Sequence, residues 1–378
     1  MRVLFICHAL SRNGASMALL QEVRYLRENY KDMYIEVLSQ TGGPLLEEFK
    51  EICPTYCIKY GRFHHIKQRL WKMFFKRPWL YGYKKGSFDV VYANTINSYP
   101  TAILFKNALG IPVLMHFHEA SINKHRIQKG YLQFTAIEAI IAVSERTKKF
   151  LVDSFSISPS TIYVQYPISP IASILMNDNS LLASKRDKGD TLNIGLCGVY
   201  RWVKSSDLLP LIIKRFFTKY PDDKCHFTYI CRFYGIEEED NKAQLEYDLH
   251  QIDMEDRLTL IQETDNPITY FQNFDILLIP SREESFALVG QEAALMGIPV
   301  VGFQGVMGLE EWLKDEGGIF VPYLDLDKLA DALHLLYTDK ELRLRIGSCG
   351  KRIAREKCEE ASKMENVIQA IKSLTVRT

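Results

Sequence analysis

The sequence predicts two doubly wound α/β domains, each built around a parallel β-sheet. Short apolar runs recur along the 378 residues, and segments with apolar residues at helical spacing alternate with them. The chain is long enough for two domains of ordinary size. A polar, proline-containing stretch between residues 164 and 190 interrupts the alternation, as a linker between domains would.

Continuous apolar runs predict the strands of the first domain, because parallel strands are covered on both faces. These runs are Arg2–Ala9, Tyr34–Leu38, Asp89–Ala93, Ile111–His116 and Ala139–Val143. After the first run, Gly14 permits a tight turn into a helix whose free N–H groups suit an anion or a sugar hydroxyl. Ser144 follows the last run and is placed to cap the next helix.

The same pattern continues after the linker. The predicted strands are Leu192–Gly198, Phe227–Cys231, Leu258–Ile261, Phe274–Pro280, Ile298–Phe303 and Gly318–Pro322. Helical spacing predicts helices at Ile268–Phe271, Asp327–Leu336, Leu342–Ala354 and Ala361–Leu374. We therefore expect domains over residues 1–170 and 190–355.

The segment from Phe274 to Phe303 predicts a strand–helix–strand unit. Its helix is expected to open at Ser285 and to end before Gly297. Polar residues crowd the turn before that helix: Ser281, Arg282, Glu283 and Glu284. Ligands of open α/β sheets bind at this edge, and the first helical turn favours an anion there.

Glu284 and Glu292 form the most specific pattern in this unit. Eight helical residues would place the two carboxylates on one face, about 12 Å apart. They would then contact different parts of one extended ligand, while backbone N–H groups hold its phosphates. The alternative is an acidic helix N-terminus that suits the helix dipole, plus one solvated glutamate.

Composition and motifs exclude several classes. The formal net charge is +1, and no run of about 18 uncharged apolar residues is available to span a membrane. The eight cysteines lack paired C-x-x-C spacing, so we expect reduced thiols, no zinc site and a cytoplasmic protein. Neither G-x-G-x-x-G nor G-x4-G-K-[ST] occurs, which disfavours a dehydrogenase and excludes a P-loop NTPase.

Residues 59–85 carry nine lysines and arginines, interleaved with aromatic residues, and no acidic residue. Within this stretch, apolar residues between His65 and Lys76 fall near one helical face. This pattern is typical of a basic amphipathic helix on an anionic membrane surface. The main alternative is a helix that packs its aromatic residues into the first domain. Nucleic acid is a weaker alternative, and we expect no nucleic-acid partner.

The segment PSREESFALVGQEAALMGIPVV resembles the Glu-x7-Glu signature of retaining glycosyltransferases of the family 4 type, which have the GT-B fold. The matching residues are Pro280, Ser281, Glu284, Phe286, Glu292, Ala293, Gly297, Pro299, Val300 and Val301. The sequence departs from the family at Ala287, where glycine is usual. Alanine keeps the backbone N–H but narrows the approach of a sugar or phosphate.

Three further segments resemble motifs of this family. The Asn13–Gly14 turn stands where the family has a glycine-rich loop that faces the catalytic cleft. His118 matches a histidine close to the donor sugar, and His116 is the second candidate. The turn after the strand at residue 192 resembles G-R-x-x-x-x-K-G, whose two cations clamp the donor diphosphate. Lys204 stands at the lysine position, but Val199 replaces the arginine, and Arg201 comes two residues later.

The resemblance implies the GT-B fold, with two Rossmann-like domains facing across a cleft and a final helix, about residues 361–378, returning to the first. It implies that the first domain holds the acceptor and that the second binds the nucleotide-sugar donor. It also implies transfer of a sugar from a UDP- or GDP-sugar to a glycan or lipid-linked acceptor, without metal or cofactor, in surface-polysaccharide synthesis. Donor binding would use Gly14, Arg201, Lys204, Glu284, Ser285, Phe286, Ala287, Leu288 and Glu292. The resemblance assigns the catalytic roles to His118, Glu284, Lys204 and Arg201.

Two other functions stay open at this point. A nucleotide-sugar epimerase on the same fold would bind the donor but need no acceptor. A non-enzymatic sugar-binding protein would need neither. The base, the sugar and the acceptor do not follow from the sequence.

Overall fold

The computed structural model describes most of the chain, and the described residues are 1–12, 14–58, 82–119, 121, 124, 127, 133–177, 191–233, 238–262, 264 and 266–375. Two compact units make up the chain, Met1–Pro170 with Lys363–Thr378, and Ile171–Ser362. Only residues 82–85 of the basic stretch 59–85 fall in the described part, so the predicted amphipathic helix lies outside it. Within the described ranges, no helix is both long and apolar enough to cross a bilayer.

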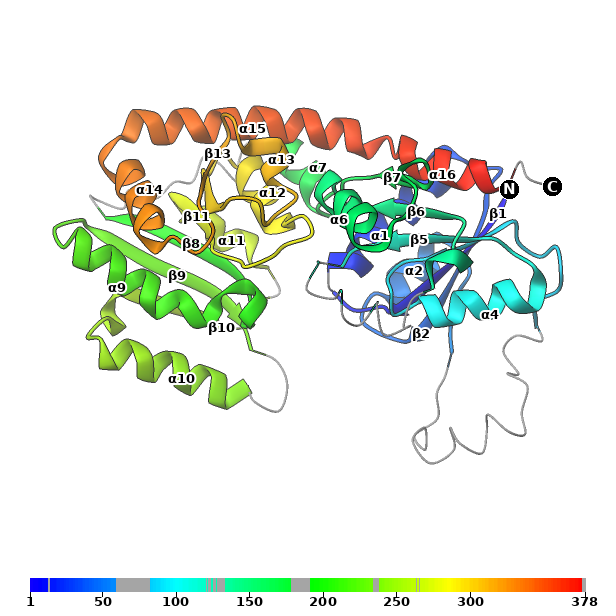
Figure 1. The fold of residues 1–378 in the computed structure, drawn as a ribbon, viewed down its shortest axis with the longest axis horizontal. Coiled ribbons are helices and arrows are strands. Elements are labelled where there is room, and N and C mark those ends of the chain that lie inside the picture. Colours follow the sequence, from blue (N-terminus) through cyan, green and yellow to red (C-terminus); the bar gives the residue numbers. More distant parts are fainter. Residues whose placement is uncertain are drawn as a thin grey trace. The chain divides into compact units, whose positions relative to one another are not determined.

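A seven-stranded parallel sheet forms the centre of the first unit (Figure 1). Its strand order is β3-β2-β1-β4-β5-β6-β7. Its strands are β1 (Arg2–Ala9), β2 (Tyr34–Thr41), β3 (Thr55–Cys57), β4 (Val90–Ala93), β5 (Val113–Phe117), β6 (Ala139–Ala142) and β7 (Ile162–Val164). All five predicted strands are confirmed. The sequence analysis missed β3 and β7, because a three-residue strand carries no periodic signal.

The helices of this unit cover both faces of the sheet. They are α1 (Gly14–Asn29), α2 (Leu46–Ile52), α4 (Tyr99–Leu109), α6 (Glu145–Phe155) and α16 (Glu365–Thr375). Alternate residues of β1 point to opposite faces, so Val3 and Phe5 pack in a cluster with α1 and α16, whereas Leu4 and Ile6 pack with α4. Burial of Val367 and its neighbours in the first cluster explains why the last helix belongs to this unit.

Ser144 caps α6 as predicted, since its Oγ accepts a hydrogen bond from the N–H of Thr147 at 3.1 Å.

The second unit has a six-stranded parallel sheet in the order β10-β9-β8-β11-β12-β13. Its strands are β8 (Leu192–Val199), β9 (Cys225–Arg232), β10 (Leu258–Gln262), β11 (Ile276–Ile279), β12 (Val300–Phe303) and β13 (Gly318–Val321). Its helices are α7 (Ala172–Asn177), α9 (Leu209–Lys219), α10 (Glu238–Gln251), α11 (Ile268–Phe271), α12 (Leu288–Leu295), α13 (Glu310–Leu313), α14 (Leu326–Thr338) and α15 (Lys340–Ser362). All six predicted strands of this half are confirmed.

The helix α15 is longer than the predicted Leu342–Ala354, and it packs against α12. A Cβ atom on Gly347 would lie 2.1 Å from the carbonyl oxygen of Gly297, so the close approach requires glycine at position 347. This contact fixes the end of α12, whose other end faces the candidate site.

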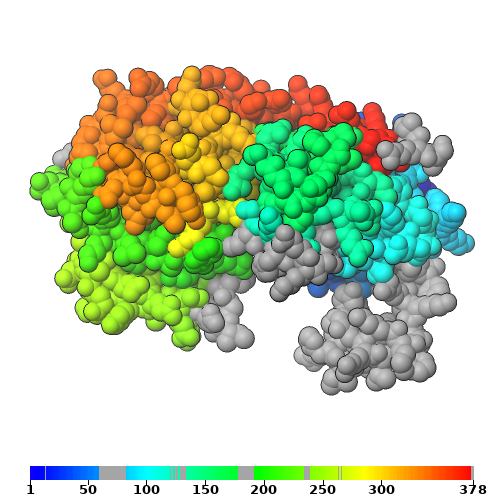
Figure 2. Space-filling model, viewed as in Figure 1, coloured from blue at the N-terminus to red at the C-terminus, as the bar shows by residue number. Residues whose placement is uncertain are grey.

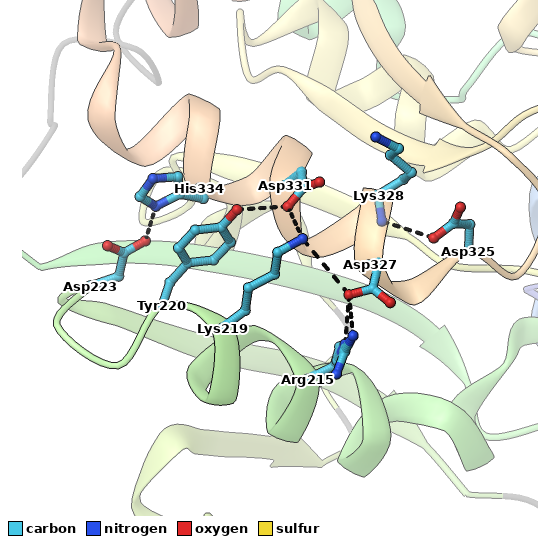
Figure 3. A network of polar contacts seen from close by, with 9 residues as sticks. All are labelled: Arg215, Lys219, Tyr220, Asp223, Asp325, Asp327, Lys328, Asp331 and His334. Atoms are coloured by element: carbon cyan, nitrogen blue, oxygen red, sulfur yellow. Dashed lines mark hydrogen bonds and ion pairs between the residues drawn. The ribbon is translucent and has the colours of Figure 1, made fainter.

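A polar network joins α9 to α14 on the outer side of the second unit (Figure 3). Asp331 accepts hydrogen bonds from Tyr220 Oη at 2.6 Å and from Lys219 Nζ at 2.5 Å. The ring of Tyr220 stacks on His334 with centroids 3.7 Å apart, and His334 Nδ1 lies 2.7 Å from Asp223. The helices α14 (orange) and α10 (light green) are both exposed on the surface shown in Figure 2. We assign this network to packing, since its residues pair with one another.

Candidate functional site

The candidate site lies where the strand order of the second sheet reverses. The chain winds from β8 to β9 and β10, then crosses to the other side of β8 and continues through β11, β12 and β13. The loops after β8 and β11 therefore diverge at the carboxyl edge between these two strands. Open α/β sheets bind their ligands at such a switch point. Lys204 follows β8 and Glu284 follows β11.

Lys204 and Glu284 form an ion pair at this edge. The carboxylate of Glu284 also accepts a hydrogen bond from Ser281 Oγ at 3.0 Å. The side chain of Glu284 is 12% exposed and that of Lys204 is 34% exposed, so the pair is largely shielded from water. The backbone of Glu284 is held in place as well, because its N–H donates to the carbonyl of Val306 at 2.8 Å.

A pocket opens beside this ion pair, and its polar lining includes Cys197, Lys204, Ser205, Ser281 and Glu284. Ser205 is fully buried, yet its Oγ has no hydrogen-bond partner. A buried hydroxyl without a partner costs free energy unless a ligand or water satisfies it. The pocket thus presents one cation and hydroxyl donors, which suit a phosphate.

Glu292 lies on α12 near the same pocket. Burial raises the pKa of Cys197 to about 12, and the charge of Glu292 adds to this rise, whereas Lys204 opposes it. Glu292 does not line the pocket itself, so its contact with a ligand stays a prediction.

The predicted start of the helix at Ser285 is wrong, because α12 begins at Leu288. Residues 284–287 form an irregular loop in which Glu284 bridges Met307. The spacing of Glu284 and Glu292 therefore does not follow from helix geometry. Competing loop hydrogen bonds explain the difference, for Phe286 accepts from Leu309 N–H at 2.9 Å.

Ala287 occupies the position where the resembling family has glycine, and its backbone is left-handed, with φ of 88° and ψ of 74°. A Cβ atom is unfavourable in this conformation, and glycine tolerates it.

Phe286 is buried and packs edge-on against Trp312, with ring centroids 4.9 Å apart. Ser285 and Leu288 are half-buried on either side. The ring of Phe286 thus anchors the loop, and Phe286 could contact a ligand only through its backbone.

We predict that Ala287→Gly stabilises the protein by up to about 1 kcal/mol, because relief of roughly 1–2 kcal/mol of backbone strain exceeds the added entropy of the unfolded chain. Urea denaturation of the two proteins measures the difference. Ala354→Gly, at a buried position of α15, is the matched control and should destabilise. Equal destabilisation by both substitutions would contradict the prediction.

Arg201 is exposed and does not line the pocket described above, so its role stays a prediction. The arginine that is built into this edge is Arg282, whose side chain is 10% exposed. It donates to both carboxylate oxygens of Asp207, at 2.7 and 2.8 Å. Asp207 lies 75 residues earlier in the sequence, so no local pattern pointed to this pair.

His118 lies at the carboxyl end of β5 in the first unit. His118 as a whole is partly exposed, but its Nε2 atom is buried and has no hydrogen-bond partner. Burial, reinforced by His116 and His8, holds the pKa of His118 well below its usual range. The ring is therefore neutral near pH 7, and its contact with a sugar hydroxyl stays a prediction. Glu119 supports the turn by accepting from the N–H groups of Ile96 at 2.9 Å and His118 at 3.1 Å.

His116, the second candidate, belongs to a buried hydrogen-bonded cluster in the core. Its Nδ1 lies 2.5 Å from Tyr92 Oη and 3.2 Å from Glu22 Oε1, and the Tyr92 hydroxyl also donates to Glu22 at 2.7 Å. All three residues are buried. The ring centroids of His116 and His118 lie 4.0 Å apart, so the buried cluster of Glu22, Tyr92 and His116 supports the ring of His118.

Gly14 is the first residue of α1, at the switch point between β1 and β4. Asn94, at the end of β4, donates to the carbonyl of Ala15 at 3.0 Å, and its own Oδ1 is buried without a partner.

Among the described residues, no group of three or more His, Cys, Asp or Glu is arranged to hold a metal ion.

Two family profiles match the chain. The profile described as Glycosyltransferase Family 4 covers residues 12–168, and that described as Glycosyl transferases group 1 covers residues 217–353. An uncharacterized glycosyltransferase of Haemophilus influenzae is 26% identical over 218 residues, which are 57% of this chain and 56% of that protein. The capsular polysaccharide biosynthesis glycosyltransferase CapM of Staphylococcus aureus is 26% identical over 95 residues, 25% of each chain. The chain thus matches about half the length, or less, of these relatives.

Among solved structures, Anabaena HepE in complex with UDP and glucose is similar over 99% of this chain and 100% of its own, with a TM-score of 0.77 and 16% identity. This similarity concerns the fold. The second unit has the Rossmann-like strand order 3-2-1-4-5-6, and the first unit has the same order with a seventh strand added at the end. The fold is GT-B, as the resemblance implied.

Proposed function

Because the chain belongs to the glycosyltransferases of the family 4 type, we propose that it transfers a sugar from a nucleotide-diphosphate sugar to a glycan or lipid-linked acceptor, with retained anomeric configuration. HepE was crystallised with UDP and glucose, which supports a UDP-sugar donor for this chain. The similarity to CapM supports a role in surface-polysaccharide synthesis.

The observation that carries this proposal is the ion pair of Lys204 and Glu284 beside the unpartnered hydroxyl of Ser205. Bound diphosphate would attract Lys204, and Ser205 would donate to a phosphate oxygen. The carboxylate of Glu284 would then be released to accept a hydrogen bond from a sugar hydroxyl. Glu292 would bind the ribose hydroxyls at the other end of the donor.

The departing nucleotide diphosphate gains negative charge as its bond to the anomeric carbon breaks. A fixed cation stabilises this charge, so Lys204 would take the place of a metal, and Arg201 would assist it. The acceptor hydroxyl would attack from the same face, and its proton would pass to the departing phosphate oxygen. His118 and Gly14 would face the sugar. This scheme needs neither a protein nucleophile nor a cofactor.

Incubation of the protein with UDP- and GDP-sugars, with and without EDTA, tests the proposal. We expect release of free nucleotide diphosphate that EDTA does not prevent. An epimerase would change the stereochemistry of the sugar and leave the donor intact. A sugar-binding protein would change neither. Release that stops on chelation would overturn the metal-free scheme alone.

A lipid-linked acceptor would require contact with the membrane, and we propose residues 59–85 for that contact. Their basic and aromatic sequence is the support. Changing Lys67, Lys72 and Lys76 to glutamate should reduce co-sedimentation with anionic phosphatidylglycerol vesicles at least about tenfold, since each basic residue contributes about 1 kcal/mol. Neutral phosphatidylcholine vesicles are the control. Undiminished binding of the variant to the anionic vesicles would exclude this stretch as the membrane contact.

A further inference from the structure

Trp202 is a large aromatic side chain on the surface of the candidate site. It lies two residues before Lys204, in the loop that follows β8, and it is 58% exposed. Exposed Trp residues at the edge of a polar site are enriched among binding residues.

The indole is held in place from one side. The guanidinium of Arg282 lies 4.5 Å from the ring centroid, and the same group donates to the Trp202 carbonyl at 2.5 Å. Arg282 is itself fixed by its two hydrogen bonds to Asp207 and by its backbone N–H, which donates to Val203 at 2.9 Å. One face of the ring is thus covered by a cation, and these contacts hold the loop in place, which lowers the cost of ordering it when a ligand binds.

A carboxylate lies beside the ring. Asp207, which binds Arg282 through both of its oxygens, has a side chain that is 42% exposed. A flat aromatic face beside a carboxylate suits a ligand with an apolar face and a hydroxyl rim. A pyranose ring has this form, whereas a lipid chain would bury the exposed part of the Asp207 carboxylate without giving it a hydrogen bond.

We propose that Trp202, with Asp207 beside it, forms a stacking subsite for a pyranose ring of the acceptor glycan. The inference rests on the proposed function, since an acceptor sugar must come close to the donor sugar held at Lys204 and Glu284. Trp202 and Lys204 belong to the same short 3-10 turn, so the subsite lies within one turn of the cation of the donor site.

Fluorine NMR of the protein labelled with 5-fluorotryptophan tests the subsite directly. The chain has four tryptophans, and Trp202→Phe identifies the resonance of Trp202. Methyl glucoside, methyl galactoside and methyl N-acetylglucosaminide are titrated with and without UDP, and glycerol serves as a polyol without a ring. We expect the Trp202 resonance to shift with at least one pyranoside and not with glycerol. No shift with any pyranoside, or an equal shift with glycerol, overturns the proposal, as does a shift with UDP that no pyranoside alters.

Saturation-transfer NMR then measures pyranoside affinity in the variants. Trp202→Ala should weaken binding about tenfold, and Trp202→Phe less than about threefold, from the usual size of aromatic stacking. Tyr247→Ala removes an aromatic ring that is 63% exposed on α10 and should change nothing. Equal affinities for Trp202→Ala and Tyr247→Ala would overturn the subsite. Thermal shift with UDP reports donor binding separately, so a failure of the proposed function is distinguished from a failure of this inference.

Discussion

Replacing Lys204 by alanine should lower kcat/KM for the nucleotide sugar by about 10²–10³-fold, the usual effect of removing one group that stabilises developing charge. Lys204 is the cation that lines the pocket, and the exposed Arg201 does not line it. The loss should fall mainly on kcat, because the charge on the diphosphate grows as the bond to the sugar breaks. The rate of nucleotide release under saturating donor measures this effect.

Three variants separate charge from structure. Lys204→Arg should keep part of the activity, since it retains the charge but not the compact ammonium group. Glu284→Gln should reduce kcat while UDP still shifts the melting temperature, because this residue is assigned to the sugar. Lys328→Ala removes an exposed lysine of α14 and should leave the rate unchanged. A Lys204→Ala variant as active as Lys328→Ala would refute the role of this cation.

The sequence predicted the strands well because they are buried on both faces. Runs such as Val90–Ala93 and Ile276–Ile279 are wholly apolar, and their length favours a strand over a helix. The fold class followed from their alternation with helices. The start of α12 was not predictable in this way, since Phe286 and Leu288 fit helical spacing although the bonds to residues 306–309 keep the loop irregular.

The candidate site was only partly readable from sequence. Glu284 and Glu292 were identified by their spacing and then by a resemblance, and Lys204 by the resemblance; the structure places Lys204 and Glu284 at one pocket. The pairing of Arg282 with Asp207 was missed, because it depends on two loops that meet only in the folded sheet. The exposure of Trp202 was not predictable from sequence either, since whether a tryptophan in a loop is buried depends on neighbours that are known only from the structure.

Replacing His118 by asparagine should lower kcat/KM by about a hundredfold if its imidazole bonds the sugar hydroxyl in the transition state. Asparagine keeps a polar group at the position but does not titrate. The low pKa of His118 has a second consequence that does not depend on substrate. Below pH 6.5, the unfolded chain binds a proton at this residue that the folded chain does not bind, so the free energy of unfolding falls as pH decreases.

This acid sensitivity reaches at most about 1.4 kcal/mol for each pH unit between the ordinary pKa near 6.5 and the lower pKa of the folded state. Urea denaturation at pH 7 and pH 5 should therefore show a smaller loss of stability for His118→Asn than for the unsubstituted protein. His8, whose pKa burial also lowers, contributes in the same direction in both proteins and cancels in the comparison. An equal loss in both proteins would mean that His118 has the same pKa in the folded and the unfolded chain. The burial of its imidazole would then not hold the ring neutral in acid, and the proposed contact with the sugar would lose this support.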